Sequence, residues 1–424
     1  MFTGGVRSIS PNLPTEESKQ SDWMKFIQKQ FSIFESSGSI TQIACRSGPG
    51  HQNARIMVGA CATQEERYNR VGEILMAYKE KPVVGETSNY EVLILDGHKK
   101  AKSTTNGQVV MRQTVTCVVY DPLTDLFFSG GYDGDVVAWN ATRAVSVDTI
   151  GSHPKPINSI ACHSSKSLVA YGCQSGGLYY FNSFDELGSR NARPSALFTK
   201  PKAKDSFSNT IDHVAIPATG AFSNTCFAGI GFLQSLGSGV VEAWDLETGS
   251  FSCASEKLPN GVTCMSLSAC GTMLVTGTGG IASDDVKGDG IVRVLDLGQS
   301  LKTSIAIKTG KFDLDCVSFC PRSTLLFMGE TSDSSIAVYD LRFPNEPLFT
   351  TTHGNLAVDS VVAHAWLSNG TILATGGHDG QVCLWDCQRG FSLVNKFEFN
   401  SSISCITYSE SNMINIVCFK FKFF

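Results

Sequence analysis

Carboxylates that share one loop are the first group of side chains that could do chemistry. Asp284, Asp285 and Asp289 lie in the stretch "IASDDVKGDG" and could bind a cation through their oxygens. The order of ligands that a calcium loop requires is absent from this stretch. We therefore interpret it as a polar loop between two strands, and we expect no metal ion there.

Cysteines are the second such group. The chain has 15 of them, an odd number, and no Cys-x-x-Cys pair occurs. The closest pairs are Cys316 with Cys320 and Cys383 with Cys387. On a strand this spacing places both side chains on one face but about 13 Å apart, which is too far for a disulfide or a shared zinc ion. The pattern favours buried thiols that act as small hydrophobic side chains in a reducing compartment.

Motifs of the common enzyme classes do not occur in this sequence. It has no P-loop, no His-Glu-x-x-His and no nucleophile motif. The stretch "GIGFLQ" resembles a dinucleotide fingerprint only superficially, because no helix is expected to follow it. We expect a protein that is not an enzyme and that holds no cofactor.

The composition limits the classes of protein further. The 424 residues carry a formal charge of −5, and 40 glycines stand against 14 prolines. Many glycines favour a fold with many tight turns, and a mildly acidic chain is a poor candidate for direct nucleic-acid binding. No apolar run approaches the roughly 18 residues of a membrane span. We expect a soluble intracellular protein.

The elements that would position these side chains are repeated along the chain. The stretch "SGGYDGDVVAWN" (129–140) has a Gly/Asp turn followed by an alternating run that ends in an aromatic residue and Asn140. Similar stretches end at Asn182, Asp245, Asp296, Asp340 and Asp386, between 42 and 63 residues apart, and an earlier one ends at Tyr78. A period near 40 to 45 residues with insertions is typical of a four-stranded repeat unit. In four of the apolar runs that precede the hairpins or begin the last unit, a cysteine occupies the same position, as Cys117, Cys264, Cys316 and Cys405.

This repeat resembles the WD-repeat (WD40) β-propeller family over residues from about 37 to 410. The resemblance depends on Trp139-Asn140, Trp244-Asp245, Tyr339-Asp340 and Trp385-Asp386, together with the Asp-Gly turns. It implies an all-β propeller in which histidine, turn aspartate and tryptophan side chains form a structural hydrogen-bonded set inside a blade. His98, His153 and His353, with Asp379 and Trp385 in the last full blade, are thereby interpreted as structural.

The number of blades has two interpretations. Seven units have a complete central hairpin, and an eighth begins at "SSISCITYSE" but continues into "SNMINIVCFKFKFF" without a turn signal. This eighth blade could be completed by strand material from the N-terminal segment, since propellers commonly pair the two ends of the chain. Alternatively, the propeller has seven blades and the sequence here departs from that of a longer protein. We favour eight blades within a domain spanning 37–424.

The N-terminal extension, residues 1–36, contains a candidate helix over 21–32. Trp23, Phe26, Ile27 and Phe31 are spaced so that they share one helical face. This segment either packs on the side of the propeller, as a helix or an outer strand, or docks on a partner protein.

One short motif suggests a partner. In "SIAVYDLRFP" (335–344), Tyr339, Asp340 and Arg342 resemble the WDxR box of substrate receptors of cullin-4-type ubiquitin ligases. An arginine fixed at a strand end offers a fork of five N–H donors to a carboxylate or to backbone carbonyls. The resemblance implies a non-enzymatic scaffold, monomeric within a larger complex, that binds the β-propeller adaptor and the cullin.

The divergent repeats, the cysteine-bearing strands and the N-terminal segment also resemble propeller subunits of heterochromatin-silencing complexes in fission yeast. That resemblance implies chromatin-associated partners, a role in histone methylation and a nuclear location, with the cytoplasm as the alternative. The other function left open is a generic WD40 scaffold in another assembly, such as one for RNA processing, trafficking or signalling.

Overall fold

The structure is a computed structural model, and it describes part of the chain. The described residues are 37, 40–46, 55–62, 69–79, 90–104, 107–163, 165–182, 195–198, 209–232, 238–279, 289–310, 314–330, 335–352, 361–399, 402–409 and 413–415. The chain divides into two compact units, Met1–Ser32 and Ile33–Phe424. The first unit lies outside the described residues, and with it the predicted helix over 21–32 and its residues Trp23, Phe26, Ile27 and Phe31.

Among the described residues of the second unit are seven antiparallel sheets of four or five strands, which we number blades 1 to 7 in chain order, and two sheets of two strands. Blade 1 contains β1 (Ile40–Cys45), β2 (Arg55–Ala60), β3 (Ile74–Lys79) and β4 (Tyr90–Ile94); blade 2 contains β7 (Val115–Asp121), β8 (Leu126–Gly131), β9 (Asp135–Asn140) and β10 (Val145–Ser152); blade 3 contains β11 (Ile157–Cys162), β12 (Leu168–Cys173), β13 (Gly177–Asn182) and β14 (Ser195–Phe198).

The later blades follow the same order. Blade 4 contains β15 (Asn209–Ala215), β16 (Thr225–Phe232), β17 (Ser238–Asp245) and β18 (Phe251–Ala254), with β19 (Leu258–Pro259) added beside β17; blade 5 contains β20 (Val262–Leu267), β21 (Met273–Thr278), β22 (Ile291–Asp296) and β23 (Lys302–Lys308); blade 6 contains β24 (Leu314–Phe319), β25 (Leu325–Glu330), β26 (Ser335–Asp340) and β27 (Phe349–Thr352); blade 7 contains β28 (Val361–Leu367), β29 (Ile372–Gly377), β30 (Gln381–Asp386) and β31 (Ser392–Glu398).

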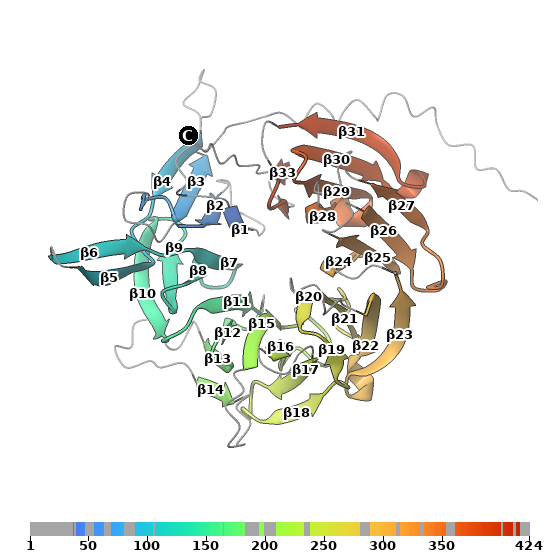
Figure 1. Ribbon diagram of the computed structural model, residues 1–424, viewed down its shortest axis with the longest axis horizontal. Coiled ribbons are helices and arrows are strands. Elements are labelled where there is room, and N and C mark those ends of the chain that lie inside the picture. Colours follow the sequence, from blue (N-terminus) through green and yellow to red (C-terminus); the bar gives the residue numbers. More distant parts are fainter. Residues whose placement is uncertain are drawn as a thin grey trace, which may run out of the picture. The chain divides into compact units, whose positions relative to one another are not determined.

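The blades of this unit are arranged in a ring (Figure 1). The first strands of successive blades contact one another, from β1 through β7, β11, β15, β20 and β24 to β28. The fourth strands lie at the periphery (Figure 1). No α-helix occurs among the described residues, which have only short 3₁₀ turns at Leu297–Gln299, Ser368–Gly370 and Cys387–Arg389. Within the same ranges no helix has the length and hydropathy needed to cross a bilayer.

The predicted Asp-Gly turn is confirmed in blade 2. Gly134 joins β8 to β9 with φ +82°, and a Cβ at this position would lie 2.0 Å from the carbonyl oxygen of His153. Asp133 accepts a hydrogen bond from the backbone N–H of Asp135 at 3.2 Å. Only glycine fits this backbone conformation and this close approach, so the turn residues fix the register of the hairpin.

Neighbouring blades meet through one repeated contact. A Cβ on Gly130 of β8 would lie 2.7 Å from the Ile157 side chain, which begins the first strand of the next blade. The same relation joins Gly59 to Val115, Gly172 to Ile211, Gly229 to Val262, Gly277 to Leu314 and Gly376 to Ile403. A glycine on the second strand therefore leaves room for a branched apolar residue at the start of the following blade.

The prediction of eight blades is not supported. After blade 7 the described chain contributes two short strands, β32 (Thr407–Ser409) and β33 (Met413–Asn415), which pair only with each other. Ile403 lies against Gly376 as the first residue of a blade does, and β32 contacts both β28 and β1. The start of a unit is therefore present, but the sequence that follows has no turn signal, and seven complete blades are described.

A two-stranded hairpin stands outside the blades between blade 1 and blade 2. It consists of β5 (Lys99–Thr104) and β6 (Gly107–Arg112), and it extends outward from the ring (Figure 1). The repeat pattern did not predict it.

The recurring cysteines lie where packing requires a small residue. Cys117, Cys264 and Cys316 are buried on the first strands of blades 2, 5 and 6. The sulfurs of Cys117 and Cys264 lie beside the inter-blade glycines Gly130 and Gly277. All described cysteines are free thiols, and burial raises the pKa of Cys117 to about 12. The prediction of buried thiols is confirmed for these positions.

Candidate protein-docking site

Blade 2 contains a buried set of polar side chains. The Nδ1 of His98 lies 2.9 Å from the Asp133 carboxylate, and its Nε2 lies 2.7 Å from the Ser129 hydroxyl. Trp139 donates from Nε1 to the same hydroxyl at 2.7 Å. All four side chains are at most 3% exposed. Because every polar atom of the set has a partner, these residues stabilise the blade, and the structural interpretation of His98 is confirmed.

His153, another histidine predicted to be structural, has aromatic partners in place of the aspartate and serine that contact His98. His153 contacts the Tyr171 hydroxyl at 3.0 Å and packs on the Tyr179 ring, and burial lowers its pKa. In blade 7, Trp385 donates to Thr375 at 2.9 Å, as Trp139 does to Ser129. His353 lies outside the described residues.

The candidate cation loop does not form a site in the described residues. Asp284 and Asp285 lie outside them, and Asp289 pairs with Arg293 while accepting hydrogen bonds from Thr278 and from the backbone of Ile291, both at 3.1 Å. In the part of the chain that the structure describes, no three or more His, Cys, Asp or Glu side chains are placed to hold a metal ion.

At the end of β26, Asp340 holds Arg342 in one orientation. The guanidinium donates from Nε to both carboxylate oxygens, at 3.0 and 3.1 Å, and from Nη2 to Oδ2 at 2.6 Å. Thr324 also donates to this carboxylate at 2.8 Å. The side chain of Arg342 is nevertheless 68% exposed, whereas that of Asp340 is 11% exposed. The remaining N–H groups of the fork, at Nη1 and Nη2, are therefore oriented but open to a partner.

Electrostatics keeps this pair charged over the physiological range. Hydrogen bonds from the Arg342 guanidinium, followed by those from the Arg342 backbone and from Thr324, hold the pKa of Asp340 well below its ordinary value. The carboxylate in turn raises the pKa of Arg342. The orientation of the fork is consequently insensitive to pH near neutrality.

A closing aspartate or asparagine has the same role in five of the described blades, whereas the arginine pair of Asp340 is not part of that role. The Asp340 carboxylate accepts from the backbone N–H of Arg342 at 3.0 Å and so caps the turn that follows β26. The same cap, at the end of the third strand, is made by Asn140, Asp245, Asp296 and Asp386. Asp340 is thus a general turn residue, and Arg342 is the feature that distinguishes this loop.

Two exposed apolar side chains lie in the same loop as Arg342. Phe343 is 72% exposed and Leu348 is 58% exposed, in the loop between β26 and β27. Arginine and aromatic side chains are enriched among the residues that carry binding energy at protein interfaces. Sequence reasoning missed both residues, although the Pro344 that follows Phe343 signals a loop rather than a continued strand.

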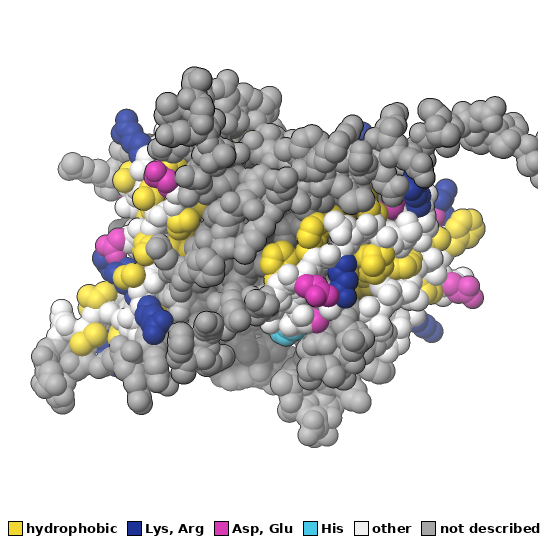
Figure 2. All heavy atoms as spheres, turned by 90° about the horizontal axis from the view of Figure 1, so that it is seen from above, with side chains coloured by type: hydrophobic (Ala, Val, Ile, Leu, Met, Phe, Trp, Pro, Cys, Tyr) yellow, Lys and Arg dark blue, Asp and Glu magenta, His cyan; other side chains and the backbone are white. Residues whose placement is uncertain are grey.

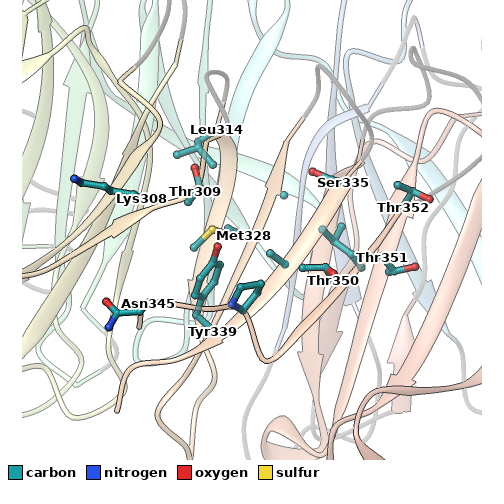
Figure 3. A pocket seen from close by; sticks show the side chains of 14 residues that line it. Lys308, Thr309, Leu314, Met328, Ser335, Tyr339, Asn345, Thr350, Thr351 and Thr352 are labelled. Carbon is teal, nitrogen blue, oxygen red and sulfur yellow. The ribbon is translucent and has the colours of Figure 1, made fainter. Parts of the chain in front are cut away.

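Tyr339, the third residue of the motif, lies inside the protein and lines a cleft. It is 5% exposed, and burial raises its pKa. The cleft has a volume of about 630 Å³ and lies between β23 of blade 5 and β26 and β27 of blade 6. In Figure 3 the Tyr339 side chain extends toward Met328, with Lys308 on one side and Thr350–Thr352 on the other. The structure thus places Asp340 and Arg342 together at the surface and Tyr339 behind them.

The side of the ring seen in Figure 2 carries charged and hydrophobic side chains among its described residues. Figure 2 shows basic and acidic side chains next to exposed hydrophobic ones over the described part of this face. Such a surface resembles the rim of a protein interface more than the basic face of a nucleic-acid binder.

Comparison with known proteins agrees with this geometry. The family model for the WD domain, G-beta repeat, matches residues 92–140, and that for the anaphase-promoting complex subunit 4 WD40 domain matches residues 317–411. The solved structure described as "Structure of Dos1 propeller" superposes with a TM-score of 0.72 and 20% identity over 89% of both chains. The chain has a β-propeller fold, and it matches models of WD40 repeats over residues 92–140 and 317–411.

This propeller is also similar to one further solved structure and to two curated proteins. "Structure of U3-55K" superposes with a TM-score of 0.53 and 17% identity, over 74% of the present chain and 89% of the other. Rik1-associated factor 1 from Schizosaccharomyces pombe is 22% identical over 84% of the present chain and 54% of its own length. Protein tipD from Dictyostelium discoideum is 23% identical over 70% of the present chain and 44% of its own length. The propeller therefore spans about half the length of the curated relatives that it matches.

Proposed function

We propose that this WD40 propeller is a non-enzymatic scaffold subunit that docks on the β-propeller adaptor of a cullin-4-type ubiquitin ligase complex through the loop at Arg342. The observation that carries the proposal is the oriented and exposed guanidinium, held by Asp340 and flanked by Phe343. WD40 propellers generally act as scaffolds that bind protein partners within complexes, and the WDxR resemblance supports this particular partner.

The same complex would act on heterochromatin in the nucleus, in the course of histone methylation. Similarity to a protein named for its association with Rik1 supports this part of the proposal, as does the fold shared with the Dos1 propeller. Chromatin-associated proteins would then bind the propeller away from the Arg342 loop, while the cullin would be reached through the adaptor.

Affinity purification with mass spectrometry tests the proposal. Wild type and Arg342→Ala are expressed in the source cell, together with Arg389→Ala as a matched control. Arg389 also follows a closing aspartate, with its Nε 3.7 Å from Asp386, and its side chain is 47% exposed. We expect the adaptor and cullin to be recovered with the wild type and the control and to be lost with Arg342→Ala.

If neither adaptor nor cullin is recovered with the wild type, the proposal is wrong. The chain would then be a scaffold of another assembly, of RNA processing, trafficking or signalling, and the recovered proteins would identify it.

A further inference from the structure

The β5–β6 hairpin presents a strand edge that no described strand covers. It forms a sheet of two strands, and β5 pairs with β6 only. Figure 1 shows the hairpin extending away from the four-stranded blades. Half of the backbone N–H and C=O groups of β5 therefore face outward along roughly 20 Å of extended chain.

The opposite edge, on β6, is capped at its base by the protein itself. Asn69 donates from Nδ2 to the carbonyl of Val110 at 2.7 Å and accepts from the backbone N–H of Arg112 at 2.9 Å. Its amide takes the place that a neighbouring strand would have. This asymmetry leaves β5 as the edge on which another strand can add.

The base of the hairpin is anchored by ion pairs. Arg112 donates to the fully buried Glu73 at 3.0 Å and to Asp96 at 2.7 Å, and Lys99 pairs with Asp96 at 2.6 Å. The anchored hairpin therefore holds β5 in a defined position, which lowers the conformational entropy lost when a partner binds.

Farther along β5 the positive charges have no partners. Lys100 and Lys102 are exposed, and among the described residues neither side chain forms an ion pair or hydrogen bond. Because side chains alternate along a strand, they share one face, while Ala101 lies on the other face opposite Val110, which is 50% exposed. Beyond Lys99, which is paired with Asp96 at the base, the edge thus has a basic face and a small apolar face.

We propose that the β5 edge binds an extended acidic segment of a partner protein by strand addition. The segment would have acidic residues at alternate positions, beside Lys100 and Lys102, and small or β-branched residues between them, beside Ala101. Main-chain hydrogen bonds supply affinity in this mode of recognition, and opposite charges on adjacent strands supply specificity.

Charge favours this occupant over two others. A second copy of the chain would place lysines opposite lysines, which is unfavourable on adjacent strands. A nucleic acid usually requires about six or more phosphate contacts, whereas two unpaired lysines remain on β5. The inference concerns a different surface from the Arg342 loop and does not depend on it.

The test uses the full chain and a labelled octapeptide in which glutamate alternates with threonine and valine. Fluorescence anisotropy compares wild type with Lys100→Glu/Lys102→Glu, and thermal unfolding checks that both proteins are folded. We expect the peptide to bind the wild type and to bind the variant at least tenfold more weakly, about 1.4 kcal/mol. A peptide with lysine in place of glutamate should bind the variant at least tenfold more tightly than the wild type.

Two further probes act on the wild-type protein alone. An acidic peptide N-methylated at alternate residues has no N–H groups to donate along one edge. It should therefore bind much more weakly if binding requires strand addition. Equal binding of the N-methylated peptide, unchanged affinity in the charge-reversed variant, or tighter binding of a 16-base-pair DNA duplex than of the acidic peptide would each overturn the proposal.

Discussion

Blades 2 and 6 differ at equivalent positions of their central hairpins. In blade 2, Trp139 pairs across the sheet with Phe127 and donates to Ser129. In blade 6 the register places Tyr339 where blade 2 has Trp139, and Met328 where it has Ser129. The first arrangement closes a hydrogen-bonded set, and the second borders the 630 Å³ cleft.

The difference shows how loss of the polar set changes a blade. Methionine cannot accept a hydrogen bond from a ring N–H as the Ser129 hydroxyl does, so the polar set of blade 2 has no counterpart at these positions of blade 6, and both Met328 and Tyr339 line the cleft. Blade 5 shows an intermediate case: Thr276 keeps the hydroxyl, but Leu295 stands at the tryptophan position. The buried Oγ1 of Thr276 has no hydrogen-bond partner among the described residues. Blade 2 therefore has an internal hydrogen-bonded set that stabilises it, and blade 6 lacks such a set at the equivalent positions.

The largest expected effect comes from breaking the set in blade 2. Asp133→Ala leaves His98 Nδ1 and the backbone N–H of Asp135 without their acceptor inside the protein. We expect a loss of about 4 kcal/mol in the free energy of unfolding, measured in urea.

Tyr339→Phe is the control for that change in blade 6. It removes a hydroxyl that lines the cleft, and we expect a loss below about 1 kcal/mol. Equal losses of unfolding free energy from the two substitutions would contradict the distinction between blade 2, which has an internal polar set, and blade 6, which borders the cleft.

A second effect concerns the contact between blades 6 and 7. His364 on β28 is half-buried, its ring centroid lies 4.5 Å from that of Phe327, and desolvation lowers its pKa to about 4. Because the unfolded chain binds a proton near pH 6.5 and the folded protein does not, stability falls as pH decreases from 6.5 to 4, by about 3 kcal/mol.

Urea unfolding at several pH values measures this slope. We expect His364→Phe, which cannot take up a proton, to remove the His364 contribution. If the variant retains the full slope of the wild type between pH 6.5 and 4, another group is responsible.

A smaller effect is expected from giving blade 6 the residues of blade 2. Met328→Ser/Tyr339→Trp should allow the new indole to donate to the new hydroxyl, as Trp139 does to Ser129. We expect stability within about 1 kcal/mol of the wild type, because the new hydrogen bond and the larger ring offset the lost methionine contacts. Shielding of the new tryptophan from acrylamide quenching measures its burial, and an indole quenched as readily as one at the surface would show that the positions are not equivalent.

Much of the fold could be predicted from the sequence, because it depends on the conformations of single strands and turns. The Asp133-Gly134 turn, the alternation in β9 and the recurring Cys117 and Cys264 each follow from the needs of one strand or one turn. The number of blades was predicted less well, since Ile403 begins a unit whose later strands the following sequence does not specify.

Features that depend on several strands were missed. The cleft is lined by residues of several strands, among them Met328 and Tyr339, and the exposure of Phe343 depends on the path of its loop. The β5–β6 hairpin did have a signal, the pair Asn106-Gly107 between alternating residues, but it stands outside the repeat period.

We propose that Arg342 of blade 6 contacts a partner protein and adds little to the stability of the fold, whereas the polar set of blade 2 stabilises its blade. Titration of a purified β-propeller adaptor of a cullin-4-type ligase with wild type and Arg342→Ala tests it most directly, with the unfolding free energy of both measured alongside. We expect about 30-fold weaker binding, near 2 kcal/mol, with stability changed by less than about 0.5 kcal/mol. Unchanged binding, or weaker binding accompanied by an equal loss of stability, would contradict the account.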